Sequence, residues 1–253
     1  MTHGSLFAGI GGFDLGFERA GIKTVWQVEI DDYCRRVLAK HFPDAQRFSD
    51  IRDCCGHRSC DDEFCGKGFQ LPWVDIISGG FHCQDISHAG NQAGMDGERS
   101  GGTWREMYRV ILEMEPRIVI VENVAALLGR GMGRVLGDLA AAGFDCEWDC
   151  LPLGAFGAHF LRDRVFIIAS RSMPSSLRSQ RSRPQPTGAW GEQQFEGLLR
   201  DQLQLALPAG RIGRISVGVP SRMDKLWGLG DAVSPAQTEW IGRRIIEAAR
   251  QPL

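Results

Sequence analysis

The sequence predicts an α/β domain with a largely parallel sheet. Short apolar runs alternate with helical patterns over about the first 170 residues, which is typical of βαβ units. Hydrophobic residues make up 43% of the 253 positions and charged residues 24%, so the chain has enough apolar material for a core. Glycine is frequent, with 32 residues, which indicates turns where the backbone approaches another group closely.

The apolar periodicity places the elements. We predict strands over 4–7, 24–28, 74–77, 117–121, 144–153 and 164–169. We predict helices over 13–20, 32–41, 104–115, 132–142 and 237–250. Gly21 and Pro116 supply the expected stops for two of these helices.

Composition excludes several classes of protein. No apolar run approaches the roughly 20 residues of a membrane span, and the N-terminus has no secretory leader pattern. We therefore expect a cytoplasmic protein without a membrane partner. The eight cysteines are expected to be reduced thiols, because a chain of this size and core content needs no disulfide framework.

Charge is unevenly distributed along the chain. The segment 170–219 contains seven arginines against three acidic residues, so it carries +4 while the remainder carries −6 of the overall −2. Much of this segment is rich in Ser, Arg, Pro and Gln, which predicts a loop or a poorly ordered linker. The segment either contacts an anionic partner or forms a solvated arginine-rich loop.

A glycine-rich turn follows the first predicted strand. Glycines such as Gly9 and Gly11 let a nucleotide cofactor approach the backbone, next to the electropositive start of a helix. Glu29 ends the second strand about twenty residues later, where a carboxylate can bind both ribose hydroxyls. Nicotinamide dehydrogenases share this turn and this acid, so the pattern alone leaves that enzyme class open.

Cys83 and Glu122 come just after two neighbouring predicted strands. The carboxyl ends of parallel strands meet at one edge of the sheet, where α/β folds bind ligands. A cysteine is often an inert, buried filler. A nucleophile beside an acid, however, is the arrangement needed to add to a polarised ring.

These residues belong to five segments that, in this order, resemble motifs of the C5-cytosine DNA methyltransferases, especially small phage-type members. The segments are 6–12 (LFAGIGG), 79–87 (GGFHCQDIS), 121–124 (VENV), 162–165 (RDRV) and 230–235 with 241–244 (GDAVSP and IGRR). The resemblance implies a Rossmann-like S-adenosylmethionine-dependent fold with helices on both faces of the sheet. It divides the chain into a catalytic and cofactor-binding domain over 1–170 with a Cys-rich insertion over 54–70, a reduced and partly disordered target-recognition region over 171–210, and a C-terminal segment over 211–253 that returns to the catalytic domain.

The resemblance also implies residue roles. Cys83 would add to C6 of a flipped cytosine, Glu122 would stabilise the ring, and Arg162 with Arg164 would hold the base and the loop around Cys83. The residues implied to bind S-adenosylmethionine are Phe7, Ala8, Gly9, Gly11, Glu29, Ile30, Asp50, Ile51, Gly80, Asp231, Ala232 and Val233. Those implied to contact the DNA or the base are Phe81, His82, Gln84 and Ser87.

The implied partner is double-stranded DNA, and the implied setting is DNA modification or restriction–modification in a bacterial or phage-infected cell. We expect a monomer. Because little more than 171–210 is available for reading sequence, we also expect salt-sensitive binding with a relaxed or very short sequence preference.

Three departures from the family pattern lie near the implied site. His82 stands where the family has proline before the nucleophile, His159 and Phe160 replace the usual Pro-Gln or Pro-His, and Asp231 replaces asparagine. A carboxylate beside a sulfonium stabilises the ground state more than the transition state. Two alternatives to methyl transfer therefore remain: alkyl transfer from a modified donor, such as decarboxylated or carboxy S-adenosylmethionine, and a decayed homologue that only binds DNA.

The insertion holds four cysteines and one histidine within twelve residues: Cys54, Cys55, His57, Cys60 and Cys65. These are zinc ligands by type, although their spacing is irregular. The sequence leaves a zinc site and a reduced, cysteine-rich surface loop as the two interpretations.

Overall fold

The computed structural model describes residues 1–57, 68–82, 98–156, 162–171 and 232–250. Its main sheet has seven strands in the order β3-β2-β1-β6-β7-β9-β8. Their bounds are β1 (Thr2–Leu6), β2 (Lys23–Val28), β3 (Gln46–Phe48), β6 (Ile76–Gly79), β7 (Ile118–Val124), β8 (Phe144–Pro152) and β9 (Asp163–Arg171). The first five of these along the chain pair in parallel, while β9 pairs antiparallel with both β7 and β8. The predicted α/β fold with a mostly parallel sheet is confirmed.

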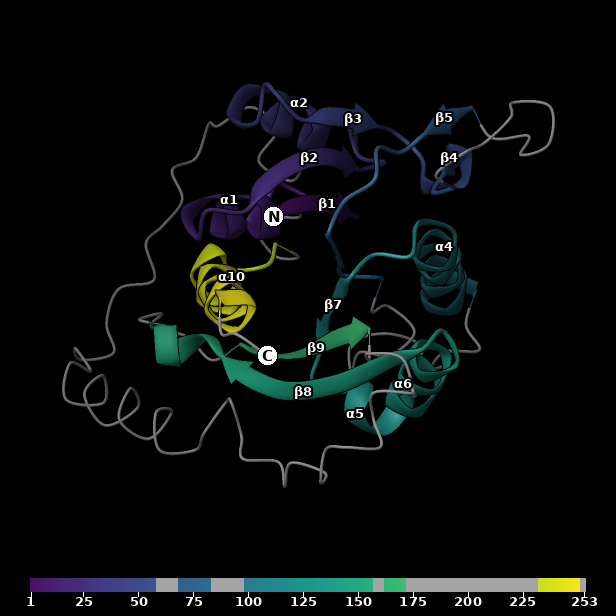
Figure 1. Cartoon of the computed structure of the whole chain (residues 1–253), viewed down its shortest axis with the longest axis vertical. Coiled ribbons are helices and arrows are strands. Elements are labelled where there is room, and N and C mark those ends of the chain that lie inside the picture. The colour runs from purple at the N-terminus through teal and green to yellow at the C-terminus, as the bar shows by residue number, and fades with distance from the viewer. Residues whose placement is uncertain (58–67, 83–97, 157–161, 172–231, 251–253) are drawn as a thin grey trace, which may run out of the picture.

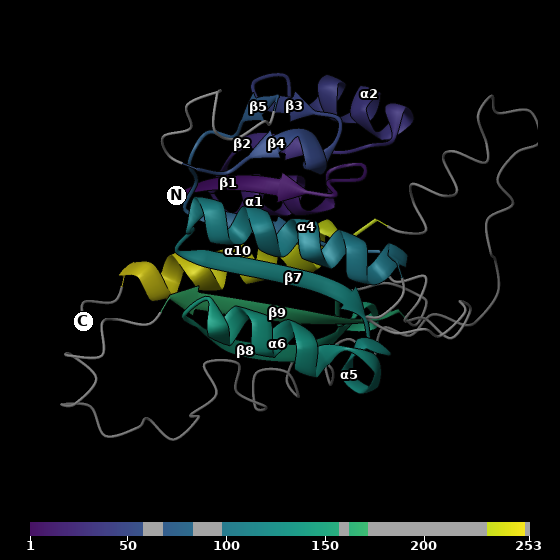
Figure 2. The ribbon, with the colours of Figure 1, turned by 90° about the vertical axis from the view of Figure 1, so that its right-hand side faces the viewer.

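Helices cover both faces of this sheet (Figures 1 and 2). They are α1 (Gly12–Arg19), α2 (Asp32–His41), α4 (Glu98–Met114), α5 (Leu127–Arg130), α6 (Met132–Ala141) and α10 (Pro235–Arg250), with 3-10 turns η1 (Ile51–Asp53) and η3 (Leu153–Phe156). A separate two-stranded sheet pairs β4 (Cys54–Cys55) with β5 (Phe69–Gln70) inside the insertion. The side view in Figure 2 places α4 and α6 together on one face of the sheet.

The core has two main layers. On one face, Trp104 and Met107 of α4 and Val135 of α6 join a large apolar cluster with alternate side chains of β1, β2, β6, β7 and β9. On the other face, Phe17 of α1 and Ile241 of α10 pack with residues from β6, β7, β8 and β9. Such opposed apolar layers follow from the side-chain alternation of buried strands.

The two ends of the described chain meet where α1 packs against α10 (Figure 1). The hydroxyl of Thr238 donates to the carbonyl of Gly12 at 2.9 Å. A Cβ at Gly12 would lie 2.1 Å from the backbone oxygen of Val233, so only glycine fits this approach. The predicted return of the C-terminal segment therefore brings it against the start of α1.

The structure corrects several element boundaries. The strand predicted to end at 121 continues to Val124, so Glu122 lies inside β7 rather than after it. The parallel partner β6 stops opposite Val121, but antiparallel pairing with β9 extends β7 by three residues. In addition, α4 begins at Glu98, before the predicted 104, and the short strand β3 was not predicted.

Polar side chains are buried between α1 and the sheet. His3 is fully buried, with its Nε2 2.7 Å from Ser78 Oγ, and burial lowers the pKa of His3 to about 3. Asp14 of α1 accepts a hydrogen bond from Gln27 Nε2 at 3.0 Å, and burial raises the pKa of Asp14 to about 6. Burial disfavours the charged form of both groups.

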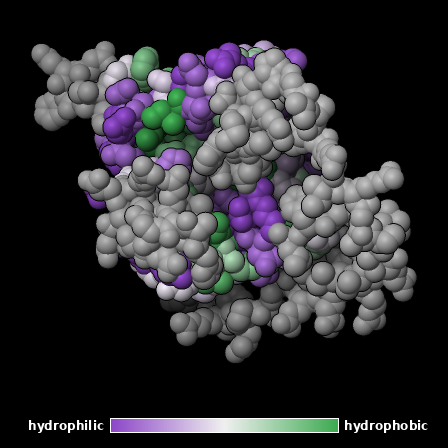
Figure 3. Space-filling view, turned by 180° about the vertical axis from the view of Figure 1, so that it is seen from behind, coloured by the Kyte–Doolittle hydropathy of each residue, from purple (hydrophilic) through white to green (hydrophobic). Residues whose placement is uncertain are grey.

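Among the described residues that are visible in Figure 3, the green apolar patches are bordered by hydrophilic side chains. Among the described helices, none has the length and apolar character needed to span a bilayer.

Candidate active site

Four strands deliver the predicted site residues to one edge of the sheet. The strands β1, β2, β6 and β7 run parallel, so their carboxyl ends lie together. Phe7 follows β1, Glu29 follows β2, Gly80 follows β6, and Glu122 lies near the end of β7. This edge is where open α/β sheets bind ligands.

The turn after β1 has an unusual backbone. Phe7, Gly9 and Gly11 all have positive φ angles, of 54°, 55° and 90°. This conformation is easy for glycine but disfavoured for Phe7, where it costs on the order of 1 kcal/mol or more. The Ala8 N–H donates to the carbonyl of Val28 at 3.1 Å, which ties the turn to β2.

Glu29 joins this turn to the end of β2. Its Oε2 accepts from the Gly9 N–H at 2.7 Å, and its Oε1 accepts from the Asp31 N–H at 2.8 Å. The glycine turn and the carboxylate, which are predicted to bind the same cofactor, are thus in direct contact with each other.

Asp50 and Ile51 lie at the start of η1, where Asp50 is the N-cap residue and Ile51 the first residue. The Asp50 carboxylate accepts from the backbone N–H of Arg52 at 2.9 Å and from its guanidinium. Ile51 is buried, whereas Ile30 after β2 is 63% exposed. The Glu29 N–H donates to the carbonyl of Phe48, the last residue of β3, which holds the ends of β2 and β3 together.

Glu122 is buried and ion-paired. It is 6% exposed, and Arg164 Nε of β9 donates to its Oε1 at 2.9 Å. A Cβ at Gly80 would lie 2.7 Å from Glu122 Oε2, so the glycine leaves room for the carboxylate. Two of the predicted catalytic residues are therefore in contact.

Asn123 holds the segment that leads to Cys83. Its Nδ2 donates to the carbonyl of Phe81 at 2.9 Å, and its Oδ1 accepts from the Val124 N–H. The His82 N–H donates to Thr103 Oγ1 at 3.3 Å, and the His82 ring lies 6.4 Å from that of Phe7. Sequence reasoning did not assign Asn123 a role, because its partner Phe81 is 42 residues away.

Arg162 contacts the returning C-terminal segment. Its Nη1 donates to the carbonyl of Ala232 at 2.6 Å. Arg162 and Arg164, two positions apart on the chain, thus reach different partners. The predicted Ala232 and Val233 lie beside the glycine turn through the close approach of Val233 to Gly12.

Several predicted residues lie outside the described part of the chain. These are Cys83, Gln84, Ser87, Asp231, Cys60 and Cys65, together with His159 and Phe160 and the whole of 172–231.

The insertion holds a group of possible metal ligands. Within the described residues, donor atoms of Cys55, His57 and Glu113 all lie within 4.8 Å of one another. Cys54, which the sequence grouped with Cys55, belongs instead to the apolar core and donates its thiol to the carbonyl of Asp50. Glu113 was missed because it comes from α4, far along the chain.

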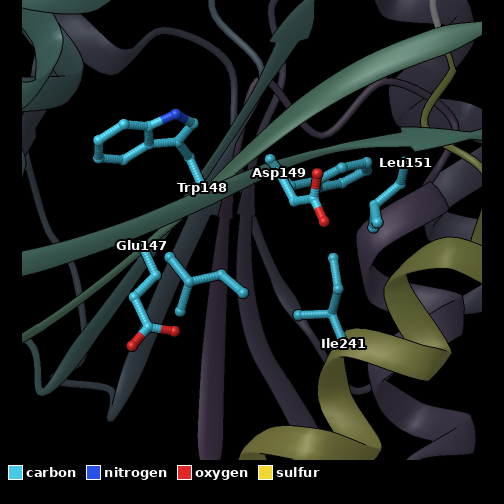
Figure 4. Close-up of a pocket in the computed structure, with 7 residues that line it drawn as sticks. Glu147, Trp148, Asp149, Leu151 and Ile241 are labelled. Atoms are coloured by element: carbon cyan, nitrogen blue, oxygen red, sulfur yellow. The ribbon is translucent and has the colours of Figure 1, made fainter. Parts of the chain in front are cut away.

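A separate pocket lies between β8, β9 and α10 (Figure 4), and none of the predicted site residues is among the residues that line it. Its lining includes Trp148, which is 51% exposed and lies on the opposite side of β8 from Glu147. Phe166 and Ile241 form part of its apolar floor. The pocket contains none of the groups that the chemistry above requires.

Comparison with known proteins agrees with these motifs. The family model for C-5 cytosine-specific DNA methylase matches residues 1–204. Curated relatives include Type II methyltransferase M2.BsuMI of Bacillus subtilis, 32% identical over 174 residues covering 66% of this chain and 41% of that protein. Another is Type II methyltransferase M.Bsp6I of a Bacillus species, 30% identical over 188 residues covering 72% of this chain and 56% of that protein. The chain thus spans about half the length of these relatives.

Solved structures support the fold. A protein described as a DNA modification methyltransferase encoded within an E. coli prophage superposes with a TM-score of 0.53 and 24% identity, covering 70% of this chain and 48% of that one. The Dnmt2 methyltransferase of S. pombe superposes with a TM-score of 0.51 and 13% identity, covering 69% and 50% of the two chains.

Proposed function

We propose that this chain, which belongs to the C-5 cytosine-specific DNA methylase family, transfers a methyl group from S-adenosylmethionine to C5 of cytosine in DNA. One observation carries the proposal: the buried Glu122–Arg164 pair lies at the same sheet edge as the Gly9–Glu29 contact. A base-stabilising acid and a nucleotide-binding carboxylate therefore share one site. A nicotinamide dehydrogenase needs only the second of these features.

The glycine turn and Glu29 fit S-adenosylmethionine. Gly9 and Gly11 adopt positive φ angles, and neither carries a side chain that could lie over the turn. Each oxygen of the Glu29 carboxylate accepts one backbone N–H and keeps a further lone pair for a ribose hydroxyl. Ile30, which follows Glu29 and is 63% exposed, offers apolar surface to the cofactor, and Asp50 with the neighbouring Ile51 is proposed to lie by the adenine. The bound cofactor supplies an activated methyl group on its sulfonium.

Glu122 is held in position to act on the cytosine ring. The thiolate of Cys83 adds to C6, so the electron pair of the C5–C6 double bond becomes available to C5. The charge that develops on the ring is stabilised by hydrogen bonding between Glu122 and the N3 side of the base. Arg164 Nε lies 2.9 Å from Glu122 Oε1 and thereby orients the Glu122 side chain. Once C5 has used the C5–C6 electron pair to bond the methyl group, loss of the C5 proton and expulsion of Cys83 would restore the ring.

The two residues that precede Cys83 are held in place by hydrogen bonds. Asn123 Nδ2 donates a hydrogen bond to the Phe81 carbonyl, and Thr103 Oγ1 accepts one from the His82 N–H. These two contacts place the residue before the nucleophile beside Phe7 of the cofactor turn. Such positioning can account for a large part of a rate enhancement, since misplacement by about 1 Å can cost 10²-fold.

DNA is the proposed substrate partner, and the arginines of 170–219 are proposed to contact its phosphates. Phosphate contacts position a protein without reading bases, so we expect a short or relaxed sequence preference. Binding that weakens steeply with salt across unrelated sequences supports this expectation. A preference for a site of several base pairs that persists at high salt contradicts it.

The activity is tested by mass spectrometry of nucleosides from DNA of a methylation-deficient bacterium that expresses this chain. We expect 5-methylcytosine with the wild type and none with Cys83→Ser or Glu122→Ala. A heavier cytosine derivative would contradict methyl transfer and identify another donor. If no modified base forms, purified protein is incubated with S-adenosylmethionine and DNA containing 5-fluorocytosine. Failure to form a covalent adduct there would refute the enzymatic proposal.

A further inference from the structure

We propose that Cys55, His57 and Glu113 form a metal site for a zinc-type divalent cation at the base of the insertion. This site shares no residue with the proposed active site and does not depend on the proposed function. The three residues offer a thiol, an imidazole and a carboxylate, which are the three side-chain ligand types that zinc takes in proteins.

The geometry of the first two donors matches a shared ion. Cys55 Sγ lies 3.3 Å from His57 Nδ1. Two donors bound to one tetrahedral zinc lie roughly 3.5 Å apart, given bonds of about 2.3 Å to sulfur and 2.0 Å to nitrogen. The two side chains therefore already lie at about the separation that the ion requires.

The backbone holds Cys55 and His57 against α4. A Cβ at Gly56, between them, would lie 3.0 Å from the carbonyl of Val110 and 3.1 Å from Glu113 Cβ, so glycine permits this close approach. Gln70 of β5 donates to the carbonyl of His57 at 2.9 Å, and the Leu71 N–H donates to that of Cys55 at 2.8 Å. Residues 55–57 are thus held by hydrogen bonds to β5 and Leu71 before any ion binds.

Glu113 is oriented toward the same point by neighbours of the kind that support metal ligands. Its Oε2 accepts from the Gly56 N–H at 2.9 Å, and both oxygens accept from Arg109 Nη1 at 2.8 and 2.9 Å. Ligating carboxylates are themselves commonly hydrogen-bonded, and Oε1, which among the described residues accepts only from Arg109, retains a lone pair for the ion. Arg109 is also paired with Glu106, so its charge is shared between two carboxylates.

Strand alternation separates the two neighbouring cysteines. Cys54 faces the apolar core and donates to the Asp50 carbonyl at 3.2 Å, while Cys55 faces His57. The thiol of Cys55 is buried, and His57 is exposed at the other side, which provides an entry path for the ion. The adjacent thiols therefore form a matched pair for experiment.

The test measures metal content of the full-length, tag-free protein grown with added zinc and dialysed against a weak chelator. We expect about one zinc per chain in the wild type and in Cys54→Ala, and its loss in Cys55→Ala and His57→Ala. Cys150→Ala, which removes a half-buried thiol on β8, is a second control expected to retain zinc. Circular dichroism confirms that each variant is folded.

Cobalt substitution identifies the ligand. The wild type and Cys54→Ala should show the thiolate-to-cobalt charge-transfer band and the visible bands of a tetrahedral ion, and Cys55→Ala should lose the charge-transfer band. Glu113→Gln should bind cobalt more weakly than the wild type. Zinc-free wild-type protein after this preparation, or a charge-transfer band that persists in folded Cys55→Ala, would overturn the assignment.

Discussion

Arg164 and Glu122 lie diagonally across the antiparallel pair β7–β9, with Arg164 Nε donating to Glu122 Oε1 at 2.9 Å. Glu122 is opposite Phe166 in the register, and Arg164 comes two residues before Phe166 on β9, on the same face. The antiparallel strand thus carries a guanidinium to an acid on the last strand of the parallel part of the sheet.

The first prediction concerns this pair. Arg164→Lys should lower the single-turnover rate of methylation by about 10²-fold, because lysine lacks the planar fork that orients the carboxylate. Binding of S-adenosylhomocysteine should be unchanged. Arg134→Lys is the control, since its ion pair with Asp138 is exposed on α6. An unchanged rate in Arg164→Lys would contradict the positioning role.

The second prediction concerns Glu29. Glu29→Gln should raise the Kd for S-adenosylhomocysteine about tenfold or more, because it removes the charge and turns one of two acceptor oxygens into a donor. Titration calorimetry measures the change. Glu247→Gln, at an exposed pair on α10, should bind like the wild type. Equal affinities for Glu29→Gln and the wild type would remove Glu29 from the cofactor site.

The third prediction concerns the contact between α1 and the C-terminal segment. Gly12→Ala should lower the free energy of unfolding by about 2–4 kcal/mol, because its Cβ would meet the Val233 oxygen at 2.1 Å. Gly137→Ala in α6 has no neighbour within 4 Å of the new Cβ, so it should gain about 0.5–1 kcal/mol. Urea unfolding followed by circular dichroism measures both. Similar free energies of unfolding for the two variants would show that the backbone at Gly12 and Val233 can move apart to accept a Cβ.

The fourth prediction concerns pH. The pKa of Asp14 is raised from 3.8 to about 6 in the folded protein, so the native state keeps its proton where the unfolded chain has lost it. The free energy of unfolding attributable to Asp14 therefore falls as pH rises from about 4 to 6 and stays lower above that. Asp14→Asn should remove this loss, so its free energy of unfolding at pH 7 should exceed that of the wild type by about 3 kcal/mol.

His3 makes the free energy of unfolding change with pH in the direction opposite to that of Asp14. Its pKa is lowered from 6.5 to about 3, so stability is lost as pH falls below about 6.5. Both groups are present in the wild type, and only His3 remains in Asp14→Asn. The difference between the two unfolding curves across pH 4–7 isolates Asp14, and a constant difference would contradict its buried, protonated state.

Much of the fold was predictable from local pattern. The helix over 32–41 has the predicted bounds, since Asp31 caps it by accepting from the Cys34 N–H. The extension of β7 to Val124 and the strand β3 were not predictable, because both depend on pairing with distant strands. Periodicity reports which side chains are buried, whereas pairing decides where a strand ends.

The sequence by itself determined the family and the order of the motifs, and it predicted Glu29, Glu122 and Arg164 as site residues, because these depend on residue type and spacing. The tertiary structure decided which groups are in contact. These contacts join Arg164 with Glu122, Arg162 with Ala232, and Glu113 with Gly56, which follows Cys55. Contacts of this kind join residues about 40 to 70 positions apart. They arise only when the sheet and its helices pack, and spacing along the chain does not encode them.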